Sequence, residues 1–120
     1  EKSLPFYTQI LSFQLEGTDI VESQGVKVAM LYTGNVKIEL LEPLNEESPV
    51  YRFLKKRGEG IHHIALKTEG ITQKIREMEN KGVRMIDRTP RKGAFGALIA
   101  FLHPSSTHGG LWELCDKNPF

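Results

Sequence analysis

The stretch GIHHIALKTEGITQKIREMENKGVRMI, residues 60–86, decides the fold. Residues 61–67 predict a β-strand, because they combine β-branched and apolar residues between glycines. A helix over 71–81 follows, since its apolar residues recur at the spacing of one helix face. Residues 83–86 predict a return to an extended strand. This part of the chain therefore predicts a strand–helix–strand unit of mixed α and β structure.

Two more strands, over 97–101 and 110–115, complete a strand–helix–strand–strand–strand series. The first half predicts a helix and three strands, over residues 4–11, 13–15, 26–31 and 36–41. One face of that first helix is predicted to be buried, through Leu4, Phe6, Tyr7, Ile10 and Leu11. The first half thus repeats the second without its opening strand, and such a repeat decides the architecture.

A short helix is predicted to link the halves. Ser48 suits the N-cap, because its hydroxyl accepts a hydrogen bond from the first helical turn. Pro49 suits the first helical position, and the helix is expected to run to Arg57. Gly58 and Gly60 then end it.

The duplication relates Glu39 to Glu113, because KIEL at 37–40 resembles LWEL at 111–114. His63 precedes Glu113 by 50 positions. The same offset from Glu39 places a counterpart of His63 about eleven positions upstream of Glu1. The opening strand of the first half is therefore expected in a preceding segment that is absent from this sequence.

Composition excludes several classes of protein. The 120 residues predict one domain, with 16 basic and 15 acidic side chains interspersed. The balance argues against a nucleic-acid or membrane-surface protein, and no apolar run is long enough to span a membrane. Cys115 is the single cysteine, so no intramolecular disulfide forms and a reducing compartment is expected.

The first candidates for chemistry are His62 and His63. On a regular strand, neighbouring side chains point to opposite faces, so both could not bind one metal ion. One histidine is then a site candidate while the other packs or faces water. A purely structural role for both is the alternative.

Glu39 and Glu113 stand in otherwise apolar strands, where a carboxylate commonly faces solvent. If both faces of these strands are covered, burial of an unpaired charge costs several kcal/mol, and a divalent metal ion would remove that penalty. One histidine and one glutamate from each half would make a four-ligand N/O site. The loops 92–97 and 103–110 give weaker indications of ligand binding and are interpreted as turns. Cys115 is interpreted as a core residue.

Three motifs together resemble the methylmalonyl-CoA epimerases of the vicinal oxygen chelate superfamily. They are IELLEPL at 38–44, RGEGIHHIA at 57–65 and FLHPSS at 101–106, followed by Glu113. The resemblance implies an α+β fold of two tandem βαβββ modules whose curved mixed sheets surround a metal site. It implies a single domain, with module one at 1–44, the linker helix at 45–59 and module two at 60–116.

The resemblance also implies the site. Glu39, His63 and Glu113 match three ligands of a divalent metal ion, and the fourth, a histidine, is expected upstream of Glu1. Co²⁺ is favoured, with Mn²⁺, Ni²⁺ or Zn²⁺ as alternatives. Gln24 and Ser106 match, less securely, residues that contact the substrate carboxylate.

The implied reaction interconverts (2R)- and (2S)-methylmalonyl-CoA by abstraction of the α-proton and formation of an enolate, as in propionate metabolism. Glu113 is one expected acid/base, and Glu39 or a water is the other. Some bacterial members have a glutamate at the place of Val28, so their two-base assignment does not transfer here.

Two alternatives stay open, a glyoxalase I-type lactoylglutathione lyase and a non-catalytic binding protein of the superfamily. Glyoxalases commonly carry an Asp-Pro-Asp-Gly turn where this chain has HPSS at 103–106, which favours the epimerase. The family implies a homodimer and an acyl-CoA partner, without nucleic acid or membrane. The location is expected to be cytoplasmic, or the mitochondrial matrix in a eukaryote.

Overall fold

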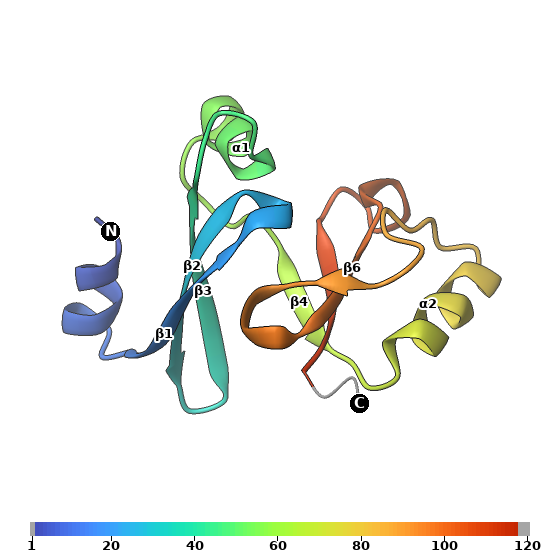
Figure 1. Cartoon of the computed structure of the whole chain (residues 1–120), viewed down its shortest axis with the longest axis horizontal. Helices are drawn as coiled ribbons and strands as arrows, with labels where there is room; N and C mark the ends of the chain where they lie inside the picture. Colours follow the sequence, from blue (N-terminus) through green and yellow to red (C-terminus); the bar gives the residue numbers. More distant parts are fainter. Residues whose placement is uncertain (1, 118–120) are drawn as a thin grey trace. The chain divides into compact units, whose positions relative to one another are not determined.

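The computed structural model describes residues 2–117 and divides the chain into two compact units, Glu1–Glu59 and Gly60–Phe120. Each unit builds its own β-sheet (Figure 1). Together they form the α+β architecture with two sheets that the sequence predicts.

The first unit is an antiparallel meander. Strands β1 (Gln14–Val21), β2 (Val26–Thr33) and β3 (Val36–Pro43) pair in the order β1-β2-β3 (Figure 1). The central strand, β2, provides most of the buried apolar side chains of this unit. Its buried residues are Val26, Val28, Met30 and Leu31. All three predicted strands are confirmed, and each ends later in the chain than predicted, while β1 begins one residue later, at Gln14.

The helix predicted near the N-terminus is a single π-helical turn, η1 (Phe6–Ile10), and its predicted buried face is wrong. Phe6, Ile10 and Leu11 are 51%, 68% and 46% exposed. Apolar periodicity shows that a helix has an apolar face, but it does not show that another element of the chain covers that face.

Helix α1 (Pro49–Arg57) begins and ends as predicted. Ser48 Oγ accepts a hydrogen bond from Val50 N at 3.2 Å and donates one to Gln24 O at 3.3 Å. The second bond ties the start of α1 to η2 (Glu22–Gln24), the turn between β1 and β2. Gly58, with φ 72°, ends the helix.

The second unit is a mixed four-stranded sheet. Its elements are β4 (Ile64–Lys67), α2 (Ile71–Asn80), β5 (Arg91–Lys92), β6 (Leu98–Leu102) and β7 (Trp112–Asp116), with the short turns η3 (Ala94–Gly96) and η4 (Pro104–Ser106) before and after β6. The strand order is β4-β7-β6-β5, and β4 runs parallel to β7 while the other pairs are antiparallel (Figure 1). A crossover through a helix is what a parallel pair requires, and α2 supplies it.

Helix α2 packs on one face of this sheet. Its buried residues Ile71 and Ile75 contact Ala100 and Leu102 of β6 and Leu114 of β7. The buried carboxylate of Asp116 accepts a hydrogen bond from Ile71 N at 3.3 Å, which satisfies a free N–H group of the first turn. The opposite face of the sheet has a separate apolar cluster built from Ala97, Ile99, Phe101, Leu111 and Cys115.

Two predicted strands of this unit need correction. The strand predicted at 83–86 is wrong, because this segment makes only an isolated bridge between Met85 and Leu102. Ile86 N donates to Phe101 O at 2.9 Å, but Arg84 N donates to the Ser106 side chain, at 2.8 Å from Oγ, so no regular ladder forms. The two-residue strand β5 lies beside β6 instead. The strand predicted from residue 61 begins at Ile64.

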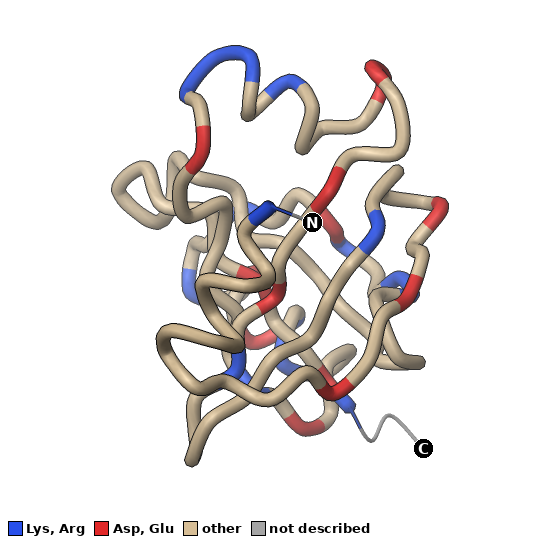
Figure 2. The backbone as a smooth tube through the Cα atoms, turned by 90° about the vertical axis from the view of Figure 1, so that its left-hand side faces the viewer, with Lys and Arg blue, Asp and Glu red and all other residues tan. Residues whose placement is uncertain are grey.

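Basic and acidic residues are interspersed along much of the described chain, although residues 93–112 contain neither kind (Figure 2). No helix within residues 2–117 is long and apolar enough to cross a membrane.

Replacement Ser48→Ala is expected to lower the free energy of unfolding by about 1 kcal/mol, because α1 loses its N-cap. Urea unfolding followed by circular dichroism measures the change. The exposed Ser23→Ala is the control and should change stability by less than about 0.5 kcal/mol. Equal effects of the two substitutions would contradict the capping role.

Candidate active site

Glu113 is a buried carboxylate on the sheet face opposite α2. Side chains alternate along β7, so Leu114 faces the helix and Glu113 faces the other way. In the strand register Glu113 lies opposite Phe101 on β6 and opposite Ala65 on β4. Its side chain is 7% exposed, so the carboxylate is almost completely removed from water.

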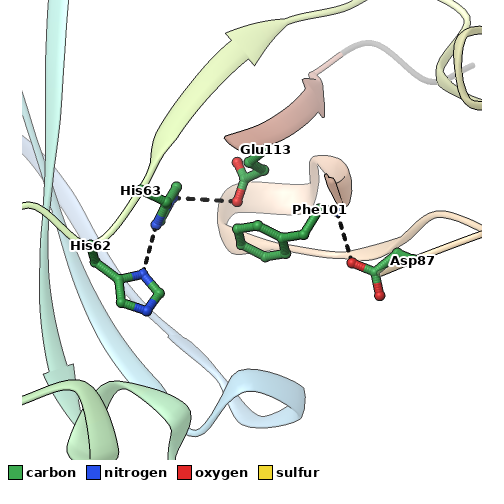
Figure 3. Close-up of polar contacts among 5 residues, drawn as sticks. All are labelled: His62, His63, Asp87, Phe101 and Glu113. Atoms are coloured by element: carbon green, nitrogen blue, oxygen red, sulfur yellow. Dashed lines mark hydrogen bonds and ion pairs between the residues drawn. The ribbon is translucent and has the colours of Figure 1, made fainter. Parts of the chain in front are cut away.

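His63 lies directly before β4, and β4 is the strand that runs parallel to β7. The hydrogen bond from Ile64 N to Leu111 O, 3.0 Å long, begins the pairing of the two strands and brings His63 beside Glu113. His63 Nε2 lies 3.4 Å from Glu113 Oε1, and the His63 side chain is 9% exposed (Figure 3). Two residues predicted from the sequence as site residues are therefore neighbours.

His62 contacts His63 rather than pointing away from it. The two Nδ1 atoms are 2.9 Å apart and the rings are nearly perpendicular, at 87° (Figure 3). The predicted alternation is wrong because residues 61–63 precede the strand and lack its regular backbone. Burial, and then the neighbouring His63, lower the pKa of His62 below its ordinary value of 6.5. The neutral form of His62 is consequently favoured.

Phe101 completes the surroundings of His63. Its ring meets the His63 ring edge to face, with centroids 5.3 Å apart. Asp87 Oδ2 accepts a hydrogen bond from Phe101 N at 2.9 Å (Figure 3). Asp87 Oδ1 lies 3.2 Å from Arg91 Nε. The Arg91 guanidinium stacks over the Phe101 ring at 5.7 Å. The sequence pattern did not indicate a role for these three residues in the site, since only the tertiary fold joins residues 87 and 91 to β6.

The chemistry of His63 and Glu113 fits part of a metal site. Imidazole nitrogen and carboxylate oxygen are donors that first-row divalent ions accept. Their separation of 3.4 Å exceeds a usual hydrogen bond of about 2.9 Å. Two ligands with bonds of about 2.1 Å to one tetrahedral ion lie about 3.4 Å apart. Within residues 2–117, however, no three His, Cys, Asp or Glu side chains form a metal-binding group.

The other predicted site residues belong to other elements of the chain. Glu39 is half-buried on β3, opposite Met30 of β2, in the first unit. The duplication is visible here, because Glu39 faces a buried apolar residue of the preceding strand just as Glu113 faces Phe101. Gln24 is half-buried at the end of η2 in the same unit. Ser106 is in η4, where its Oγ accepts the hydrogen bond from Arg84 N.

Residues 1–101 match the family described as the Glyoxalase/Bleomycin resistance protein/Dioxygenase superfamily. The chain belongs to this superfamily. An uncharacterized protein from Bacillus subtilis is 43% identical over 92% of this chain and 79% of its own length. The mitochondrial methylmalonyl-CoA epimerase of Bos taurus is 35% identical over 95% of this chain and 66% of its own length.

Solved structures agree with these relatives. A single-substitution variant of Streptomyces coelicolor methylmalonyl-CoA epimerase, in complex with 2-nitronate-propionyl-CoA, has a TM-score of 0.93 and 37% identity. The similarity covers 98% of this chain and 85% of that one. These proteins confirm the resemblance drawn from the sequence motifs and, with it, the expectation of an enzyme of the epimerase class.

Replacement Asp87→Ala is expected to lower the free energy of unfolding by about 1–3 kcal/mol, because Phe101 N loses its acceptor. Asp87→Asn keeps a side-chain oxygen for this N–H group and should cost less than half as much. Urea unfolding of both variants measures the difference. A loss for Asp87→Asn as large as that for Asp87→Ala would show that the charge near Arg91, rather than the bond to Phe101, stabilises the site.

Proposed function

We propose that this chain is a methylmalonyl-CoA epimerase that interconverts the (2R) and (2S) epimers, with Glu113 as one acid/base. The observation that carries this proposal is the buried pair of His63 and Glu113 in a chain whose relatives include methylmalonyl-CoA epimerases. The sequence favours it over a glyoxalase, because residues 103–106 lack the turn typical of glyoxalases.

The reaction needs a base and an acid on opposite sides of one carbon atom. C2 of methylmalonyl-CoA lies between a thioester and a carboxylate, so its C–H bond is weakly acidic. The Glu113 carboxylate takes the proton, and the electron pair of the broken bond moves onto the thioester oxygen as an enolate. Return of a proton to the opposite face inverts the centre. The burial of Glu113 limits competing proton exchange with bulk water.

The enolate carries charge that must be stabilised in a site with little water. His63 and Glu113 would hold a divalent metal ion together with Glu39 and a histidine expected upstream of Glu1. When bound, this ion supplies electrostatic stabilisation of the developing negative charge. The His63 ring is fixed for such a role by its contacts with His62 and Phe101. Co²⁺ is the favoured ion, with Mn²⁺, Ni²⁺ or Zn²⁺ as alternatives.

The remaining assignments extend this proposal. Glu39 or a water serves as the second acid/base, and Val28 occupies the place where some members have a glutamate. Gln24 and Ser106 contact the substrate carboxylate. Ser106 can do so through its hydroxyl hydrogen, since its oxygen already accepts from Arg84 N. The working protein is a homodimer in propionate metabolism, in the cytoplasm or the mitochondrial matrix.

Replacement Glu113→Gln is expected to slow the uptake of deuterium at C2 by about 10²- to 10⁴-fold, because the acid/base is lost. Each epimer is incubated in D₂O and the mass of the acyl-CoA is followed with time. Metal content is measured on the same samples, so that loss of the ion and loss of the base are separated.

The matched control is Glu59→Gln, which removes an exposed carboxylate at the end of the first unit. It should exchange deuterium at the wild-type rate. Near-normal uptake from both epimers by Glu113→Gln would contradict the role of Glu113.

A further inference from the structure

His62 contacts His63 but is neither a ligand nor an acid/base in the reaction scheme. Its Nδ1 atom lies 2.9 Å from His63 Nδ1, a distance at which one proton is shared between two nitrogen atoms. Two N–H groups facing each other would repel, and so would two lone pairs. One of the two Nδ1 atoms therefore carries the proton and the other accepts it.

The two possible arrangements have opposite consequences for His63 Nε2. If His62 Nδ1 donates, His63 Nδ1 is the acceptor and the remaining proton of His63 is on Nε2, facing Glu113. If His63 Nδ1 donates, Nε2 has a lone pair directed toward the space it shares with Glu113 Oε1. Only the second arrangement allows His63 to bind a metal ion through Nε2.

We propose that His62 is a positioning residue, whose Nδ1 accepts the Nδ1 proton of His63 and thereby keeps a lone pair on Nε2 of His63 that can bind a divalent ion beside Glu113. The inference rests on the proposed metal-dependent function. His62 itself then carries its proton on Nε2. A hydrogen bond from the second nitrogen of a histidine ligand fixes both its tautomer and the orientation of its ring.

The packing around His63 supports this role. Phe101 restrains one side of the ring, with centroids 5.3 Å apart, while His62 restrains the Nδ1 edge. The ring of His62 is nearly perpendicular to that of His63, at 87°. Rotation of the His63 ring by half a turn would place its carbon edge against His62 and lose the shared proton. The orientation of the ring is therefore set by neighbours other than the metal ion.

Nuclear magnetic resonance of ¹⁵N-labelled protein loaded with Zn²⁺ tests the proposal directly, because long-range ¹H–¹⁵N correlations distinguish the tautomers of each histidine. The expected result is that His63 has its proton on Nδ1 and zinc on Nε2, with the proton of His62 on Nε2. Zinc on His63 combined with a proton on His62 Nδ1 would overturn the role of His62 alone. Histidine signals of residue 63 that do not respond to zinc would overturn it together with the proposed metal site.

Two substitutions provide an independent measurement. His62→Leu removes the acceptor and is expected to weaken Zn²⁺ binding by about 10- to 100-fold. His62→Asn keeps an oxygen near the position of Nδ1 and should stay within a few-fold of the wild type. Competition with a chelator gives the dissociation constants, and circular dichroism checks the fold. Equal Zn²⁺ affinities for the two variants would contradict the proposal. If His62→Leu does not fold, the tautomers measured on the wild-type protein decide the proposal.

Discussion

The site depends on one costly arrangement, a carboxylate buried beside an imidazole. Glu113 and His63 have 7% and 9% of their side chains exposed and approach to 3.4 Å. A carboxylate buried without a compensating charge costs several kcal/mol, so a chain under no functional constraint would favour an apolar residue on this strand. A cation between the two groups, either a proton or a metal ion, removes that cost. The chemistry that we propose follows from the same need.

The sheet of the second unit makes this arrangement possible. The parallel pairing of β4 with β7 places the residues before β4 next to the first residues of β7. Helix α2 covers one face and leaves the other for Glu113, with small Ala65 on one side and Phe101 on the other. Asp87 anchors the backbone of Phe101, whose ring supports His63. The position of each reactive atom is therefore set by elements distant in sequence.

Local features were predictable from the sequence, and long-range contacts were not. Ser48 and Pro49 define the start of α1 through interactions within one turn, so their pattern sufficed. The repeat revealed Glu113, because two glutamates at equivalent places in apolar strands are unusual. The contact of His62 with His63 depends on where β4 begins, which residue types alone do not determine. The exposure of Phe6 and Ile10 likewise depends on which elements pack against them, and the spacing of apolar residues in the sequence does not determine this.

The most direct test of the central claim is the conversion of (2S)- to (2R)-methylmalonyl-CoA, coupled to a mutase that accepts only the (2R) epimer. The protein is first stripped of metal and then given Co²⁺, and the substrate of glyoxalase I is assayed in parallel. A metal-dependent epimerase predicts no turnover before Co²⁺, turnover after it, and none of the glyoxalase substrate. Turnover of the glyoxalase substrate alone, or epimerisation that is unchanged by removal and return of the ion, would contradict the claim.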